Sequence, residues 1–260
     1  MTPDIWTSIA ALAGGAVIGL LLTVFGGGGS VLATPLLLYV VGIRDPHVAI
    51  GTSAAAVAVN ALGGLVTQAR AGRVKWPCAL VFGGAGLAGA LGGAQLAKQI
   101  DGGLLMIWFA GAMALVAVSM LLPKRSEGDP GVHLTPSMTL KLAPVGLGVG
   151  LAAGFFGIGG GFLIAPGLMA ATGMTLANAA ASSLVSVALF GGATSASYAA
   201  SGLIDWTVFA LLIMGGALGT FAGVPLAKAL ASRAPVARRM FAVMVLITAG
   251  YVAWRSLTGG

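Results

Sequence analysis

Two similar stretches, 131 residues apart, decide the fold of this chain. Residues 19–35 read GLLLTVFGGGGSVLATP, and residues 150–166 read GLAAGFFGIGGGFLIAP. In each stretch an apolar segment runs into a cluster of glycines, and a proline follows five or six residues after the cluster. Because glycine is about 1 kcal/mol less favourable than alanine inside a helix, each cluster predicts a broken helix.

The composition places these broken helices in a membrane. Of 260 residues, 58% are hydrophobic and 7% are charged, whereas a typical soluble domain carries about 25% charged residues. These fractions exclude a water-soluble monomer. The net charge of +7 does not indicate a nucleic-acid binder, because the basic residues form no run with interleaved aromatic residues. The single cysteine, Cys78, permits no disulfide within the chain.

Charge-free windows indicate how many helices to expect. A bilayer core about 30 Å thick needs about 20 apolar residues per helix. Four windows have this length: 46–69, 76–97, 102–123 and 206–227. The windows 5–43 and 142–204 are too long for one crossing, and the glycine clusters divide each of them into a long helix and a short one. The short helices, at roughly 30–42 and 161–172, either span the membrane or fold back as re-entrant segments.

The repeat extends beyond the glycine clusters. Trp76 and Trp206, for example, are equivalent at an offset of 130 residues. Such matches are independent of the glycine and alanine bias that can imitate a repeat. We therefore expect an all-α, polytopic membrane helix bundle of about eight to ten helical segments. It divides into a first repeat at 1–122, a linker at 123–141 and a second repeat at 142–260.

The basic residues predict that the two repeats face opposite ways. Lysine and arginine collect on the cytoplasmic side of a membrane, yet the loop at 70–75 carries three of them and its equivalent in the second repeat carries none. The bias is reversed in the next pair of loops, at 98–101 and 228–239. Placing 70–75, the linker and 228–239 in the cytoplasm puts ten of the 13 basic residues there. The repeats are then inverted, and both termini lie outside the cytoplasm.

Inverted repeats are a recurrent feature of secondary transporters that work by alternating access. The doubled stretches 19–35 and 150–166, with hydroxyl pairs downstream at 52–53 and 182–183, resemble the TauE/SafE sulfite exporter family of membrane permeases. The resemblance covers nearly the whole chain, although Ser182 stands where the family usually has threonine. It implies transport of a small sulfur-containing anion, such as sulfite, thiosulfate or an organosulfonate like sulfoacetate, across a bacterial inner membrane.

The glycine clusters form the first part of the expected binding site. Backbone N–H groups freed at membrane depth must face protein or a polar cavity, and the start of the next helix favours an anion there. The structural alternative is that the glycines only permit close packing or a tight turn. The residues concerned are Gly26, Gly27, Gly28, Gly29, Ser30, Gly157, Gly159, Gly160 and Gly161.

Polar side chains complete the expected site. Hydroxyls near the helix starts expected at about 47 and 178 either reach the substrate or bond to carbonyls of their own helix. These hydroxyls belong to Thr52, Ser53, Ser182 and Ser183. Asn60, near the middle of its helix, either donates to the substrate or joins two helices. Arg44 either clamps a sulfonate or only pairs with Asp45 in a loop.

Other functions fit the sequence less well. A passive anion channel is the main alternative, but it would favour a continuous polar stripe along one helix, which is not seen. An intramembrane hydrolase with Ser30 as nucleophile and His47 as base does not fit this pattern, because the motif is duplicated without a second such pair. We expect no catalytic residues, no cofactor and no metal, since one cysteine and two distant histidines do not make a metal site. The expected partners are a small anionic substrate and the lipid bilayer, without nucleic acid and with homo-oligomer formation left open.

Overall fold

The computed structural model describes residues 5–121, 128–129, 131–157, 161–231 and 234–258. Within these ranges the chain is helical and contains no strand, which confirms the all-α fold. The first half contains α1 (Ile5–Phe25), the 3-10 helix η1 (Gly26–Leu32), α2 (Ala33–Leu36), the π-helix η2 (Leu37–Val41), α3 (Pro46–Arg70), α4 (Trp76–Ala97) and α5 (Gly102–Leu121). The second half contains α6 (Pro136–Phe156), α7 (Gly161–Thr172), α8 (Leu176–Ala199), α9 (Trp206–Ala231) and α10 (Ala234–Thr258).

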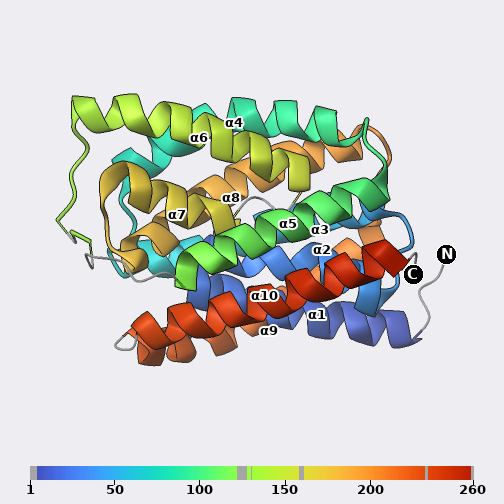
Figure 1. The fold of residues 1–260 in the computed structure, drawn as a ribbon. Coiled ribbons are helices and arrows are strands. Elements are labelled where there is room, and N and C mark those ends of the chain that lie inside the picture. Colours follow the sequence, from blue (N-terminus) through green and yellow to red (C-terminus); the bar gives the residue numbers. More distant parts are fainter. Residues whose placement is uncertain (1–4, 122–127, 130, 158–160, 232–233, 259–260) are drawn as a thin grey trace.

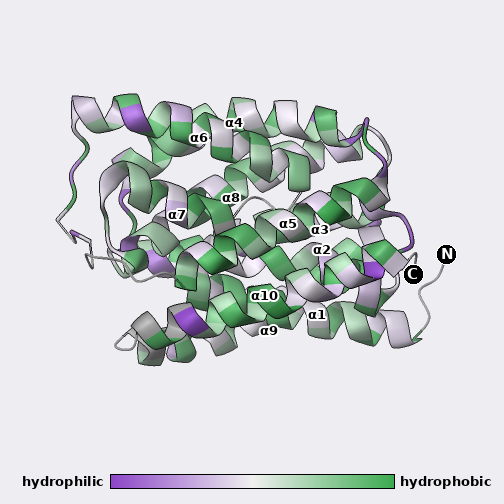
Figure 2. Cartoon of the chain, viewed as in Figure 1, coloured by the Kyte–Doolittle hydropathy of each residue, from purple (hydrophilic) through white to green (hydrophobic). Residues whose placement is uncertain are grey.

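The bundle has the surface of a multi-pass membrane protein. Among the described residues, eight helical stretches are long and apolar enough to cross a membrane. Large apolar side chains project from the outside of the bundle, including Phe221 at 79% exposure and Leu115 at 73%. Figure 2 shows the hydrophilic residues gathered mainly at the two ends of the bundle, in and beside the connections between helices. The polytopic membrane bundle expected from composition is therefore confirmed.

Short polar side chains define where several helices begin. Asp45 Oδ1 accepts a hydrogen bond of 2.8 Å from the backbone N–H of His47 at the start of α3. Thr135 Oγ1 and Thr175 Oγ1 accept equivalent bonds of 3.3 Å at the starts of α6 and α8. These N-caps satisfy N–H groups that a helix leaves unpaired in its first turn. The boundaries of these helices are therefore set by local sequence.

Both broken helices fold back as hairpins. After α1 the chain reverses at Gly26, whose φ of +64° lies in the left-handed region, and residues 26–41 return alongside α1. A Cβ atom on Gly29 would overlap the backbone of Leu21, so the returning segment packs closely on α1. In the second half α7 returns alongside α6 and occupies the short helix expected at 161–172. Each hairpin begins and ends at one end of the bundle (Figure 1).

The first glycine cluster forms a tight helix and is not an unwound stretch. Gly26–Leu32 is a 3-10 helix, which continues through one α-helical turn into a π-helix that ends at Val41. The short helix expected at roughly 30–42 therefore begins earlier, within the glycines. Residues i and i+3 are eclipsed in a 3-10 helix, and glycines have no side chains to collide in that arrangement.

Two pairs of helices join the halves through backbone contacts. α1 packs against α9, and α6 packs against α4. A Cβ atom on Gly19 would overlap the carbonyl oxygen of Gly216, and one on Gly150 would overlap that of Gly86. The two contacts are equivalent under the sequence repeat. In lipid, small residues let helix backbones approach closely, and packing drives the association of helices there.

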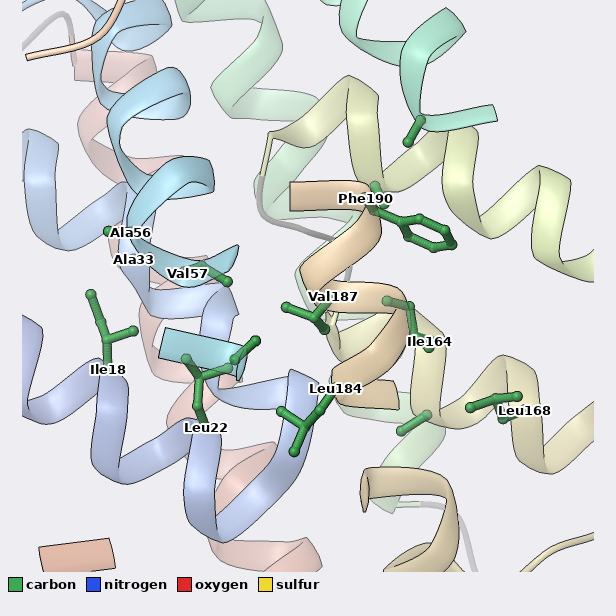
Figure 3. Packing of buried hydrophobic residues seen from close by; sticks show 14 of the residues in the cluster. Ile18, Leu22, Ala33, Ala56, Val57, Ile164, Leu168, Leu184, Val187 and Phe190 are labelled. Atoms are coloured by element: carbon green, nitrogen blue, oxygen red, sulfur yellow. The ribbon is translucent and has the colours of Figure 1, made fainter. Parts of the chain in front are cut away.

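Helices α3 and α8 cross at the centre of the bundle. Gly51 of α3 lies beside Tyr198 of α8, and Gly64 lies beside Leu184, so the two helices run in opposite directions. Figure 3 shows buried side chains of α3 and α8 packed with those of α1, α2 and α7. α5 packs against α10 beside this core. The start of α1 and the end of α10 lie at the same end of the bundle (Figure 1).

We predict that Gly150→Ala destabilises the protein and that Gly148→Ala does not. The added methyl group at 150 overlaps the backbone of Gly86, whereas Gly148 of the same helix faces open space. Overpacking of this kind costs about 1–3 kcal/mol. The check is thermal unfolding of the purified protein in detergent, and equal melting temperatures for the two variants would contradict the backbone contact.

Candidate functional site

The two glycine breaks cross inside the molecule and touch through their backbones. A Cβ atom on Gly161 would overlap the carbonyl oxygen of Gly27. Gly26–Ser30 and Gly161 are all buried. Gly159 and Gly160, which the sequence assigns to the same site, lie outside the residues that the structure describes. The structure thus brings together segments that are more than 130 residues apart in the chain. Below, the crossing means these two breaks together with the neighbouring hydroxyls of Ser30, Thr34, Ser53 and Ser183.

Each break also rests against a helix of the opposite half. Gly26 packs on the backbone of Ala180 in α8, and Gly157 packs on the side chain of Ile50 in α3. Gly26 and Gly157 are equivalent positions of the repeat, as are Ile50 and Ala180. Each half therefore contacts the other's break at an equivalent position, through the backbone in one case and a side chain in the other.

Ser183 completes the hydrogen bonding of the first break. Its Oγ accepts a bond of 3.1 Å from the backbone N–H of Gly27 and donates one of 2.8 Å to the carbonyl of Ala180. Ser30 Oγ donates a bond of 2.8 Å to the carbonyl of Gly27. A buried polar group that loses its partner costs about 1–3 kcal/mol. The hydroxyl of Ser183 therefore gives the N–H of Gly27 a hydrogen-bond partner, although Gly27 lies in a 3-10 helix and not in an α-helix.

Ser53 occupies the equivalent position in α3. Its Oγ donates a bond of 3.0 Å to the carbonyl of Ile50 and lies 2.9 Å from Oγ1 of Thr34. Both hydroxyls are fully buried. Sequence reasoning missed Thr34, although it precedes Pro35 inside the quoted motif. Its repeat equivalent is Ala165, so the duplication provided no signal for a hydroxyl at this position.

Thr52 and Ser182 bind connecting loops and do not join the crossing. Thr52 Oγ1 accepts a bond of 2.9 Å from the backbone N–H of Asp205, in the connection between α8 and α9. Ser182 Oγ accepts one of 2.9 Å from the backbone N–H of Lys75, in the connection between α3 and α4. Lys75 and Asp205 are themselves repeat equivalents. Because α3 and α8 run in opposite directions, these two loops close opposite ends of the bundle.

Two other residues assigned by the sequence lie away from the crossing. Asn60 is 5% exposed and donates a bond of 3.4 Å from Nδ2 to the carbonyl of Leu212 in α9, so it joins two helices. Arg44 lines a cavity of about 550 Å³ beside the connection between η2 and α3. No residue of the crossing lines that cavity. Asp45, the alternative partner for Arg44, instead caps α3.

The crossing offers hydrogen-bond donors without formal charge. Its donors are the N–H of Gly27 and the hydroxyls of Ser30, Thr34, Ser53 and Ser183, each of them satisfied within the protein. In the described ranges no group of three or more histidine, cysteine or acidic residues is placed to hold a metal ion. A ligand that binds at the crossing must therefore exchange with existing hydrogen bonds.

Known proteins match this chain over most of its length. Residues 11–252 match the family described as Sulfite exporter TauE/SafE. A "Probable membrane transporter protein" of Xylella fastidiosa (strain Temecula1 / ATCC 700964) is 43% identical over 249 residues, which covers 95% of each chain. The "Probable membrane transporter protein YdhB" of Bacillus subtilis (strain 168) is 26% identical over 214 residues, which covers 80% of this chain and 85% of YdhB. No solved structure gives a significant match.

We predict that Ser183→Ala lowers the thermal stability of the protein and that Ser195→Ala has little effect. The first substitution leaves the buried N–H of Gly27 without its acceptor, at a cost of about 1–3 kcal/mol. Ser195 lies on the same helix and donates only to the carbonyl of Gly192, one turn back. Unfolding curves in detergent compare the two variants. A Ser183→Ala protein as stable as Ser195→Ala would mean that the bond to Gly27 contributes little.

Proposed function

Because the chain belongs to the TauE/SafE sulfite exporter family of membrane transporters, we propose that it moves a small sulfur-containing anion across the bacterial inner membrane by alternating access. The candidate substrates are sulfite, thiosulfate and organosulfonates such as sulfoacetate. The anion binds where the two glycine breaks cross. The names of the family and of the relatives describe transporters, not enzymes.

The observation that carries this proposal is the contact between Gly27 and Gly161. It lies between the two halves of the chain, and each half supplies one break and at least one hydroxyl beside it. A site on such a boundary is exposed to alternate sides of the membrane when one half moves against the other. A site within one half would not be exposed in this way.

We further propose that the halves at 1–122 and 142–260 are inverted repeats. Three features support this interpretation: the opposite directions of α3 and α8, the exchanged contacts of the two breaks, and the matching loop bonds to Thr52 and Ser182. With the loop at 70–75 in the cytoplasm, the start of α1 and the end of α10 lie outside it. Exchange of the two halves' conformations then interconverts the two accessible states.

The loop bonds at opposite ends suit a pair of gates. The N–H of Asp205 reaches Thr52 at one end, and the N–H of Lys75 reaches Ser182 at the other. A hydrogen bond contributes about 0.5–1.5 kcal/mol net to stability. Breaking one of them to open one end is therefore within the range that substrate binding can supply.

The donors at the crossing suit an oxyanion. Fully ionised sulfite and sulfonate groups offer oxygen acceptors and no donors, so they require N–H and O–H groups. The N–H of Gly27 is such a group, and it loses its acceptor when the two halves separate. The hydroxyls of Ser53 and Ser183 donate to carbonyls of their own helices, and each reaches an anion by rotating away from that carbonyl. Neutral donors also bind an anion less tightly than charged ones, which permits release on the far side.

Transport by the purified protein in proteoliposomes tests the proposed activity. We expect uptake of radiolabelled sulfite that is accelerated by unlabelled sulfite inside the vesicles. Such counterflow requires a carrier that alternates between two states, and a passive channel would show uptake without acceleration. The absence of uptake for sulfite, thiosulfate and sulfoacetate would reject the proposed substrate class.

We predict that Gly28→Leu reduces transport more than about tenfold, which corresponds to about 1.4 kcal/mol in the barrier. A Cβ atom at this position already lies 2.9 Å from the ring of Phe241, and the rest of a leucine side chain would crowd the crossing. Its repeat equivalent, Gly159→Leu, is expected to act in the same way. Gly84→Leu is the matched control, because Gly84 faces open space. Normal flux through a monodisperse Gly28→Leu protein would remove the glycine break from the substrate path.

A further inference from the structure

The cavity of about 550 Å³ lies at the end of the bundle where α10 finishes. Its walls come from η2, the connection between η2 and α3, the start of α5 and the end of α10. Two of the lining residues are arginines, Arg44 and Arg255, and none of the lining residues is acidic. The cavity is therefore a basic recess in a chain of which only 7% is charged.

Two carboxylates close in sequence to the cavity walls accept hydrogen bonds from backbone groups. Asp45 Oδ1 accepts from the N–H of His47 at the start of α3, and Asp101 Oδ1 accepts from the N–H of Gly103 at the start of α5. Among the described residues, no carboxylate forms an ion pair with Arg44 or Arg255. Neither arginine of the cavity is therefore held in an ion pair with a neighbouring acidic side chain of the described ranges.

Arg255 is held in place with one donor unused. Its guanidinium lies 5.6 Å from the ring centroid of Tyr39, within the range of a cation–π contact. Its Nε is buried and has no hydrogen-bond partner among the described residues. An unpaired buried donor is costly, more so on a charged group. The aromatic contact thus orients the guanidinium, and one of its N–H donors has no partner among the described residues.

We propose that this cavity is an outer anion site, in which Arg44 and Arg255 bind a doubly charged sulfur oxyanion. Guanidinium groups match the geometry of oxyanions and bind them with paired hydrogen bonds. Two arginines in one recess, neither of them in an ion pair within the described part of the chain, favour a dianion over a monovalent ion such as chloride. This inference rests on the proposed transport function. In that function the site concentrates substrate at one mouth of the transport path.

The segment that folds back from the crossing connects the two sites. Leu38 and Tyr39 line the cavity and belong to the π-helix η2, a type of helix that is frequent at functional sites. Thr34, one helical turn before Leu38, lies with its hydroxyl 2.9 Å from that of Ser53. The hydroxyl of Thr34 therefore lies about one helical turn along this segment from a residue of the cavity wall.

The arginine at position 44 is not repeated in the second half of the chain. In the second repeat the positions equivalent to Arg44 are Met174 or Thr175, neither of which is charged. Under the proposed orientation the cavity lies on the side away from the cytoplasm. An oxyanion is therefore held at the outer mouth of the path, and the inner mouth has no matching arginine at this position.

Charge-selective labelling of a cysteine in the cavity tests this proposal without measuring transport. Cys78, the single native cysteine, is replaced by alanine, and Ser256→Cys provides a reporter in the cavity wall. The full-length protein in detergent is treated with an anionic and a cationic methanethiosulfonate. The ratio of the two rates is divided by the same ratio for Ser137→Cys, an exposed position near the start of α6.

We expect the normalised ratio to favour the anionic reagent by at least about tenfold, as charged recesses concentrate counterions by about 10- to 1,000-fold. Sulfate should protect the cysteine better than chloride at equal ionic strength; sulfate is the probe because sulfite attacks these reagents. Arg44→Gln together with Arg255→Gln should abolish both effects. Arg239→Gln, on the same helix as Arg255 but near its other end, should abolish neither.

A normalised ratio near one, or equal protection by sulfate and chloride, would overturn the outer site. These two readouts need only the reporter variant, so they remain decisive if the double arginine variant does not fold. Selective labelling and sulfate protection in a protein that transports none of sulfite, thiosulfate and sulfoacetate would uphold the site and reject the proposed function. Sulfite transport without selective labelling would reject the site alone.

Discussion

Direct contact between helix backbones is the constraint on which the rest of this structure depends. In lipid, apolar side chains gain little from touching each other in place of the bilayer, so helices associate through close packing. The pairs α1 with α9 and α4 with α6 meet at glycines whose missing Cβ atoms would otherwise overlap a carbonyl oxygen of the partner. Because each pair combines one helix from each half, these contacts fix how the halves sit together.

The same absence of side chains brings the two glycine breaks into contact. A break in a membrane helix must satisfy its backbone groups without help from water. Here the N–H of Gly27 is satisfied by Ser183 of the opposite half, and the loops at both ends bond to Thr52 and Ser182 in the same exchanged manner. Hydrogen bonds that cross between the halves respond directly to any movement of one half against the other, which couples the site to the proposed gates.

Charge and hydrogen bonding have separate places in the molecule. The crossing contains only neutral donors, whereas Arg44 and Arg255 lie in a cavity at one end of the bundle. A charged side chain at the centre of a bilayer costs several kcal/mol, and this cost explains why these two arginines lie near one end of the bundle. The arrangement would collect an anion by charge at the surface and pass it through the interior by hydrogen bonds that are weak enough to release it.

The sequence by itself determined the all-α membrane bundle, the two glycine breaks and the short helix at 161–172, because hydrophobic length, absence of charge and glycine clusters act locally along the chain. It also identified Ser53 and Ser183 as candidate site residues, since they occupy equivalent positions in the two repeats. Only the tertiary structure decided which hydroxyls face the crossing and which bind loops, that Asn60 joins α3 to α9, and that Thr34 and Arg255 lie beside predicted site residues. These relations join residues from different helices, so they depend on how the helices pack and on which face each side chain occupies. The pattern of residues along the chain does not indicate that packing.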